Sequence, residues 1–596
     1  MQSTETVLSV IRERGRRGLP LERLYRQLFN RELFLVAYGR IYSNDGAMTP
    51  GVTRETVDGM SLAKIDAIIG ALRSESYRWK PARRVYIEKK GTTKKRPLGM
   101  PTWSDKVVGE VVRLLLEAYY DVRFSDRSHG FRPGRGCHTA LDEVVRTWTG
   151  THWFVEGDIS DCFGSLDHQV LISILAEKIH DGRFLRLIER MLEAGYLEDW
   201  LWNATLSGAP QGGIASPVLS NIYLDRLDQF VEQRLIPEYT RGDLRRRTPA
   251  YARLQYRIAV GKRLGDREAV SALRRQLRHL PSGDPNDPDY RRLKYVRYCD
   301  DFLLGFAGPK HEAEEIKARI QSFLREQLKL ELSPSKTLIT HAANQAARFL
   351  GYEIKVQHAD TKITSGKRSA NGRVGLFVPG TVIRNRCASY MRKGKPTHRG
   401  LLMHDQDYTI VARYGSEYRG FIQYYLLAQN VHRLGRLRRV MEVSLLKTLA
   451  AKHKSTVNKM ALKYKAVIET PDGLRTCYEA VVQRDNGRKP LVARFGGIPL
   501  KRKRTARIAD VKPTMAVTKR NELIHRLLAG QCEMCEGLTG LQVHHVRKLA
   551  DLNRPGRSER PVWVRIMAMR KRKTLVVCEC CHQDIHAGRA KVTTRK

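Results

Sequence analysis

The sequence of 596 residues has no long apolar run. No stretch approaches the roughly 20 apolar residues that a membrane-spanning helix requires. Residues 1–17 also have no apolar signal core. These absences predict a protein without a membrane association or a signal peptide, located in the cytoplasm of a bacterium or inside an organelle.

Cysteine is scarce over most of the chain. Five of the ten cysteines are scattered over the first 500 residues, and the other five lie between residues 532 and 581. This distribution is not typical of a disulfide framework. Two C-x-x-C pairs close together instead indicate a metal site.

Acidic residues are few compared with basic ones. Asp and Glu number 62 against 107 Lys and Arg, so the formal net charge is +45. A charge of this size predicts a nucleic-acid partner that is bound through its phosphates. A membrane surface is the rival polyanion. The hydrophobic content of 42% is enough for several domains with real cores.

Adjacent carboxylates at Asp300 and Asp301 lie between apolar runs, as at the tip of a hairpin. Burying them is costly unless cations are present. Asp158 ends another apolar run upstream. Together the three acids predict a site for two Mg²⁺ ions that catalyses nucleotidyl transfer, with the carbonyl of Ile159 as one more ligand. The alternative for each segment alone is a surface turn with solvated acids.

A basic hairpin precedes these acids. Residues 84–90 alternate like a strand, and residues 91–99 return as its partner. Arg96 offers two donors to a phosphate, and Lys89 offers a point charge. We expect both to bind the triphosphate of a substrate, although such hairpins are often only solvated edges.

Several motifs occur in a fixed order. They are the basic hairpin, the Asp158 strand, Pro-Gln-Gly-Gly at 210–213, Tyr-Cys-Asp-Asp at 298–301, Leu-Ser-Pro-Ser-Lys-Thr at 332–337 and Phe-Leu-Gly-Tyr at 349–352. This order resembles the fingers and palm of a reverse transcriptase. Residues 46–52 resemble the additional N-terminal block of group II intron and non-LTR enzymes. Cys299 stands where the tetrad normally has Ala, Val or Met, a position that does not bind metal.

The resemblance implies roles for three further residues. Phe163 matches the steric gate that excludes a 2′-hydroxyl, and Gln211 matches a residue that contacts the incoming dNTP. Lys336 matches the lysine that protonates the leaving pyrophosphate. The alternatives are a buried Phe, a turn Gln and a helix-capping Lys.

Helical, tyrosine-rich residues from about 375 to 470 resemble the maturase or X domain, which forms the thumb and implies binding to intron RNA. The basic tetrad at 501–504 predicts contact with DNA. A basic insert at 237–293 is either a solvated helix pair or an RNA contact.

The C-terminal region contains two C-x-x-C knuckles. Four thiolates suit one structural Zn²⁺ in tetrahedral geometry, and residues 536–577 lie between the knuckles. The expected ligands are Cys532, Cys535, Cys578 and Cys581.

Histidines between and after the knuckles resemble those of an HNH endonuclease. The resemblance implies that His545 is the general base and that His544, His582 and His586 hold a divalent metal, with the reverse assignment of His544 and His545 left open. Lys573 stands where the family has its middle asparagine. A DNA-binding zinc module with inert histidines is the alternative.

Together these resemblances imply a multidomain α+β protein of the group II intron-encoded family. The expected divisions are an N-terminal fingers extension (1–75), fingers and palm of a right-hand polymerase (76–370), a helical thumb or maturase X domain (371–470), a DNA-binding region (471–525) and a zinc-containing ββα-metal HNH domain (526–596). The implied activities are RNA-directed DNA synthesis, assistance to intron splicing and nicking of target DNA to prime reverse transcription during retrohoming. A splicing-only maturase or a reverse transcriptase of a retron or diversity-generating element are the competing hypotheses.

Overall fold

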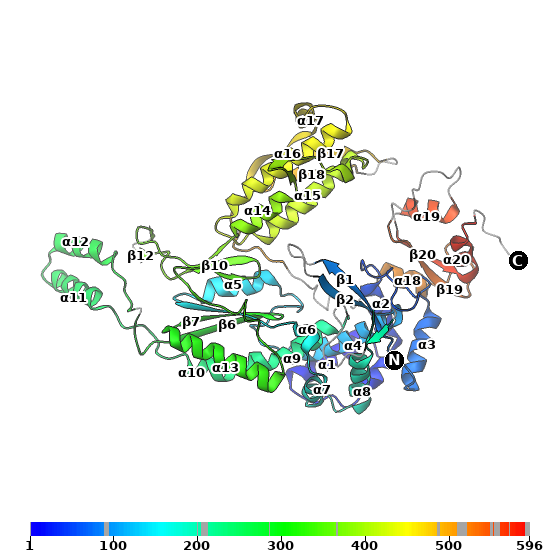
Figure 1. Ribbon diagram of the computed structural model, residues 1–596, viewed down its shortest axis with the longest axis horizontal. Helices are drawn as coiled ribbons and strands as arrows, with labels where there is room; N and C mark the ends of the chain where they lie inside the picture. Colours follow the sequence, from blue (N-terminus) through cyan, green and yellow to red (C-terminus); the bar gives the residue numbers. More distant parts are fainter. Residues whose placement is uncertain are drawn as a thin grey trace.

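The protein consists of a broad mixed body with two attached units, as the computed structural model shows (Figure 1). A mainly helical unit rises above the body, and a C-terminal unit lies beside the N-terminal helices. The described residues are 2–88, 95–198, 201–203, 213–284, 286–364, 367–484, 489–508, 521–548, 552, 561–570 and 572–589. Within these ranges, every helix is too short or too polar to cross a membrane.

Five helical segments form the N-terminal part of the body. They are α1 (Thr4–Arg16), η1 (Tyr25–Phe29), α2 (Arg31–Ile41), α3 (Leu62–Arg73) and α4 (Trp103–Tyr120). Polar side chains cap α1, α2, α3 and α4 by accepting hydrogen bonds from main-chain N–H groups of the first turn. Helix α4 is buried along most of its length, so the other helices pack around it.

The basic hairpin predicted from the sequence is present. Strand β1 (Ala82–Glu88) pairs antiparallel with β2 (Lys95–Met100), and Ile87 lies opposite Arg96. Strands β4 (Tyr196–Glu198) and β5 (Leu201–Asn203) complete a sheet in the order β2-β1-β4-β5. Lys89 lies outside the described residues.

A four-stranded antiparallel sheet forms the centre of the body, in the order β6-β7-β3-β8. Its strands are β3 (Trp153–Asp158), β6 (Arg292–Tyr298), β7 (Asp301–Ala307) and β8 (Ile339–His341). Val155 and Leu304 join the core that includes helix residues 218–235 and 313–328. Phe154 and Leu303 face a second core, so the sheet is covered on both sides.

Helices surround this sheet, with α13 below it and α5 above it in Figure 1. They are α5 (Cys137–Thr147), α6 (Cys162–Ser165), α7 (His168–Ala176), α8 (Gly182–Glu193), α9 (Ser216–Phe230), η2 (Val231–Leu235), α10 (Ile236–Glu238) and α13 (Lys310–Leu328). The basic insert forms α11 (Pro249–Arg263) and α12 (Arg267–Leu277), a hairpin with its own small core that projects from the body.

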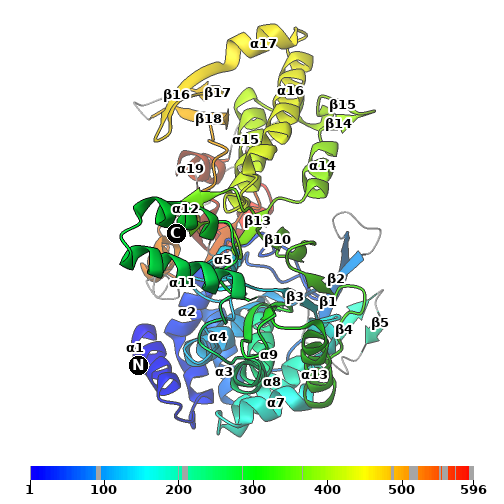
Figure 2. The same ribbon diagram turned by 90° about the vertical axis from the view of Figure 1, so that its left-hand side faces the viewer.

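The upper unit rises above the central sheet in both views (Figures 1 and 2), and its core is continuous with the core on that face of the sheet. Short strands lead into it: β9 (Ala347–Phe349), β10 (Tyr352–Val356), β11 (Ile363–Thr364), β12 (Lys367–Arg368), β13 (Val374–Phe377), β14 (Met391–Arg392) and β15 (Lys395–Pro396). Its helices are α14 (Gly380–Ala388), η3 (Gly400–Leu402), α15 (Asp407–Tyr424), η4 (Val431–Leu434), α16 (Gly435–Lys452) and α17 (Val457–Tyr464).

A three-stranded sheet follows these helices without a break. It comprises β16 (Lys465–Thr470), β17 (Gly473–Val482) and β18 (Leu491–Gly496). Phe495 packs against the buried ring of Tyr418 on α15, with 5.1 Å between the ring centroids. The boundary expected at residue 470 therefore falls at the turn of a hairpin that packs on the helical unit.

The C-terminal unit has a ββα arrangement. Strands β19 (Leu541–His545) and β20 (Thr574–Cys578) pair antiparallel, and α20 (Glu579–His586) follows directly. The remaining helices are α18 (Glu522–Leu528) and α19 (Val562–Arg570). Residues of α18 and of both strands join the same core as the N-terminal helices. This shared core fixes the unit against α2.

Candidate catalytic and metal sites

The three predicted acids meet at one end of the central sheet. Asp158 is the last residue of β3 and lies directly opposite Asp301, the first residue of β7. Asp300 occupies the turn between β6 and β7, next to Cys299, whose φ is +56°. The hairpin tip therefore brings Asp300 and Asp301 next to Asp158 at the end of β3, as the sequence indicated.

The local environment disfavours negative charge on Asp300 and Asp301. Burial raises the pKa of Asp301 to about 7, and the charge of Asp300 and a hydrogen bond with Asp158 add to the shift. Burial likewise raises the pKa of Asp300. Crowded, partly desolvated carboxylates ionise readily only when cations are nearby. Their hard oxygen donors fit Mg²⁺, so the residues present suit the metal that the sequence implied.

Cationic side chains already lie near the acids. Nζ of Lys336 lies 2.6 Å from Oδ2 of Asp158. The positive charges of Lys336 and Arg96 oppose the burial effect on the pKa of Asp300. The structure thus brings the hairpin cation and the downstream lysine to the same site as the acids. Gln211, in contrast, lies outside the described residues.

Phe163 and Ile159 follow Asp158 along the chain. Phe163 is half-buried on α6, and its ring packs edge-on against Phe131 with 6.4 Å between centroids. The Ile159 side chain is buried, and its N–H donates to the carbonyl of Asp300 at 3.4 Å. Both residues adjoin the acids, and the hydrogen bond of Ile159 ties β3 to the hairpin turn.

Arg297 supports the acidic turn from below, a role that sequence reasoning missed. Its side chain is fully buried and forms an ion pair with Asp228 on α9. Nη1 also donates to the carbonyl of Cys299 at 2.9 Å. Little in the sequence signalled this role, because the same strand also contains Arg292 and Lys294.

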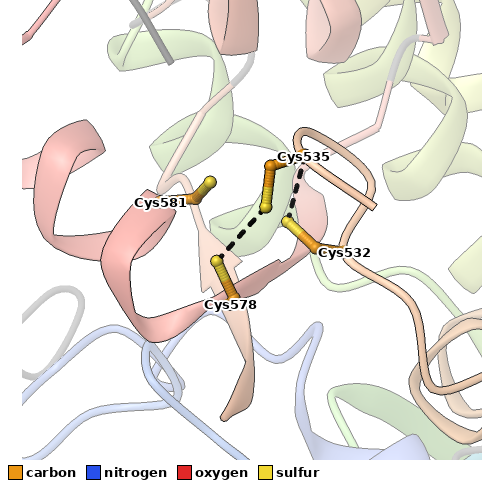
Figure 3. A group of neighbouring side chains, drawn as sticks. All are labelled: Cys532, Cys535, Cys578 and Cys581. Atoms are coloured by element: carbon orange, nitrogen blue, oxygen red, sulfur yellow. Dashed lines mark hydrogen bonds between the residues drawn. The ribbon is translucent and has the colours of Figure 1, made fainter. Parts of the chain in front are cut away.

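Four sulfur atoms converge in the C-terminal unit (Figure 3). The Sγ atoms of the two knuckles all lie within 4.8 Å of one another, and those of Cys535 and Cys578 are 3.5 Å apart. Tetrahedral Zn–S bonds of about 2.3 Å place sulfurs about 3.8 Å apart. The four cysteines named from the sequence therefore fit a zinc ion.

A second cluster contains the three histidines predicted as metal ligands. The ligand atoms of His544, His582 and His586 lie within 4.8 Å of one another and of an oxygen of Asp58. The sequence did not point to Asp58, which belongs to the loop before α3. Imidazole nitrogens with one carboxylate fit a divalent transition metal or Zn²⁺.

His545 points away from this cluster, as expected for neighbours on a strand. Its ring lies against Tyr38 of α2 and Tyr42 at the C-cap of that helix, with centroids 6.3 and 6.1 Å away. Burial lowers its pKa to about 4. Lys573 lies just before β20, where its carbonyl accepts a hydrogen bond from the N–H of Val546 at 3.0 Å.

Three family models match successive parts of the chain. Residues 87–354 match the reverse transcriptase (RNA-dependent DNA polymerase) family, and residues 382–487 match the type II intron maturase family. Residues 532–582 match the AI2M/AI1M-like HNH endonuclease family. The order of the matches agrees with the order of the sites described above.

Two relatives align over almost the whole of this chain. The chain is 39% identical over 608 aligned positions to the group II intron-encoded protein LtrA of Lactococcus lactis subsp. cremoris, covering 98% of this chain and 99% of that protein. It is 33% identical to an uncharacterized 91 kDa protein in the cob intron of Schizosaccharomyces pombe, covering 94% of this chain and 69% of that one. The chain therefore belongs to the group II intron-encoded proteins, and it is a multifunctional protein with reverse transcriptase, maturase and HNH endonuclease domains.

Proposed function

We propose that the central sheet is the palm of a right-hand polymerase, with the β1–β2 hairpin in the fingers and the unit around α14–α17 as the thumb. The observation that carries this proposal is the pairing of Asp158 with Asp301 beside Asp300. Two Mg²⁺ ions bound there would stabilise the attacking and leaving oxygens of nucleotidyl transfer. Asp158, Asp300, Asp301 and the carbonyl of Ile159 are the proposed ligands.

The surrounding side chains would handle the substrate. Arg96 and Lys89 bind the triphosphate of the dNTP, and Gln211 contacts the nucleotide. Phe163 excludes the 2′-hydroxyl. Lys336 donates a proton from Nζ to the leaving pyrophosphate, and its position against Asp158 supports this role.

The C-terminal unit would nick DNA. His544, His582 and His586 hold a divalent metal that stabilises the scissile phosphate when bound, and His545 takes a proton from the attacking water. The four cysteines hold a structural Zn²⁺. Because their zinc would pin β20 and α20 to the loop before β19, it supports the fold of the unit and takes no part in the reaction.

In this proposal the protein binds its intron RNA and helps it to splice, mainly through phosphate contacts made by its large positive charge. The intracellular ribonucleoprotein then binds target DNA, and the residues between the thumb and the nuclease contact that DNA. The nick made by the nuclease supplies the 3′-hydroxyl that primes cDNA synthesis during retrohoming.

A coupled assay on labelled target DNA tests the proposal. The ribonucleoprotein should give cDNA covalently joined to the nicked strand. Asp158→Ala should give nicked DNA without extension, and His545→Ala should give neither a nick nor joined cDNA. If Asp158→Ala still yields joined cDNA, the polymerase site lies elsewhere. A splicing-only maturase would yield none with the unmodified protein.

A further inference from the structure

We propose that Asp58, from the N-terminal region, is a fourth ligand of the nuclease metal and latches the nuclease in a closed position against α2. The inference rests on the proposed roles of His544, His582, His586 and His545. The inference adds to the metal site a residue that is distant in the sequence. It also means that the nuclease can cut DNA only after it is released from α2.

The carboxylate of Asp58 faces all three histidines. Oδ1 lies 3.3 Å from Nδ1 of His544 and 3.2 Å from Nε2 of His582. Oδ2 lies 2.8 Å from Nε2 of His586. Three imidazoles and one carboxylate around a common point form a complete four-coordinate site.

Two further features prepare this site for a metal. Nδ1 of His582 lies 2.8 Å from Oε1 of Gln542, so a proton held there leaves Nε2 free to ligate. Both ring nitrogens of His544 are buried; Nδ1 has only the 3.3 Å ion-pair contact with Asp58, and Nε2 has no hydrogen-bond partner among the described residues. Buried polar atoms without partners are costly, and a metal would satisfy one of these nitrogens.

The main chain fixes Asp58 in this position. The N–H of Gly59 donates to the carbonyl of Val543 at 3.0 Å, and the N–H of Val543 donates to the carbonyl of Met60 at 2.9 Å. The N–H of His545 donates to Oδ1 of Asp58 at 2.7 Å. Residues 58–60 therefore extend the nuclease sheet along β19, a form of strand addition. Gly59 has φ +76°, which favours glycine at this point.

Apolar contacts support the docked position. Leu523, Ile524 and Val543 of the nuclease unit belong to the same buried core as the N-terminal helices. The side-chain amide of Asn521 donates to the carbonyl of Gly39 on α2 at 2.9 Å. The metal cluster is thus one part of a larger interface between the two ends of the chain.

Docking also encloses the proposed base. His545 is only 5% exposed, and Tyr38 and Tyr42 lie against its ring. Its Nδ1 lies 3.2 Å from the carbonyl of Val543, and its Nε2 is buried without a hydrogen-bond partner in the described part of the chain. A scissile phosphate and its attacking water cannot reach this nitrogen until α2 moves away. The latched nuclease is therefore inactive, and DNA cleavage requires release from α2.

Metal binding and interface protection can be measured without any nuclease activity. The full chain carries Asp301→Ala so that the polymerase site does not bind the probe, Mn²⁺ alone. We expect Mn²⁺ to slow hydrogen exchange in peptides covering residues 55–60 and 541–545. Asp58→Asn keeps a side-chain oxygen that can accept from the His545 N–H. In this variant Mn²⁺ should no longer slow the exchange, and Mn²⁺ should bind at least about tenfold more weakly. Losing a residue that only contacts a metal ligand already costs about tenfold in affinity.

Asp66→Asn is the matched control, because Asp66 is an exposed acid on α3 that pairs with Arg31 at 2.7 Å. It should behave as the unmodified protein does. If Asp58→Asn binds Mn²⁺ as tightly as the unmodified protein and shows the same protection from exchange, Asp58 is not a ligand of the metal.

Nicking of target DNA at saturating Mn²⁺ tests the closed position. Tyr42→Ala, which leaves the metal ligands intact, should nick faster than the unmodified chain, with unchanged Mn²⁺ affinity. Unchanged or slower nicking by Tyr42→Ala would overturn the latch, because the contact of Tyr42 with His545 would then not restrain the nuclease. Nicking by His545→Ala would instead refute the assignment of the base, and the exchange data would still decide the role of Asp58.

Discussion

Arg297 and Asp228 form a fully buried, two-point ion pair beneath the acidic hairpin. Nε of Arg297 lies 2.8 Å from Oδ1 of Asp228, and Nη2 lies 2.6 Å from Oδ2. Because the same guanidinium donates to the carbonyl of Cys299, the pair connects α9 to the turn that holds Asp300. The geometry of the acids therefore depends on a charge pair that touches neither substrate nor metal.

Asp228→Asn should destabilise the protein by roughly 3–5 kcal/mol, because Arg297 would retain a buried charge without its counterion. Thermal unfolding monitored by circular dichroism measures the effect. Asp289→Asn is the control, since Asp289 pairs with Arg246 on the exposed surface and should contribute about 1 kcal/mol or less. If both variants lose the same free energy of unfolding, the buried Arg297–Asp228 pair contributes no more to stability than the exposed pair.

Asp300→Ala should abolish primer extension on an RNA template with Mg²⁺, because it removes an acid proposed to bridge the two metals. RNA binding and splicing assistance should persist, since those contacts are spread over other, basic surfaces. Filter binding and a splicing assay measure them in parallel. Normal cDNA synthesis by this variant would refute the polymerase assignment.

Phe163→Val should allow incorporation of ribonucleotides, because the smaller side chain leaves room for a 2′-hydroxyl. The ratio of dNTP to rNTP incorporation on one template measures the change. Phe131→Val is a suitable control, as it alters the ring that packs against Phe163 and retains the gate itself. Unchanged discrimination in Phe163→Val would make that ring a packing residue only.

His545→Ala should eliminate nicking of DNA, spare extension of a supplied primer and retain zinc. Cys535→Ser should instead release zinc and unfold the C-terminal unit, because structural zinc sites contribute folding free energy. Metal analysis together with a nicking assay separates the two effects. Zinc retention by Cys535→Ser would contradict the four-cysteine site.

Polymerase activity should require more Mg²⁺ as the pH falls below about 7. Burial and the neighbouring Asp300 raise the pKa of Asp301 to about 7, so the carboxyl binds a proton below that pH and is ionised above it. A proton on Asp301 competes with the metal. Mg²⁺ titrations of primer extension at pH 6, 7 and 8 measure this, and a half-saturating concentration independent of pH would contradict it.

Local motifs made the grouping of the palm acids and of the C-terminal Cys and His side chains predictable. Asp158 and Asp301 each sit where an apolar strand begins or ends, and two C-x-x-C pairs leave few other ways to arrange four sulfurs. Asp58 was not predictable in this way. Its hydrogen-bond partners lie 487 to 528 residues further along the chain, so only the packing of α18 and β19 against α2 brings them together. The β16–β18 sheet was missed because β16 follows directly from helix α17 and the strands mix charged with apolar residues.

The β-bridge that joins Met60 to Val543 of β19 has a consequence for shortened forms of the protein. Removing the C-terminal unit would leave the hydrogen-bonding groups of Gly59 and Met60 unpaired and uncover the tyrosines of α2. An open strand edge beside aromatic surface promotes self-association. A soluble polymerase without its nuclease would therefore need polar replacements at Tyr38 and Tyr42, and natural loss of the nuclease would have to be accompanied by changes on this distant face.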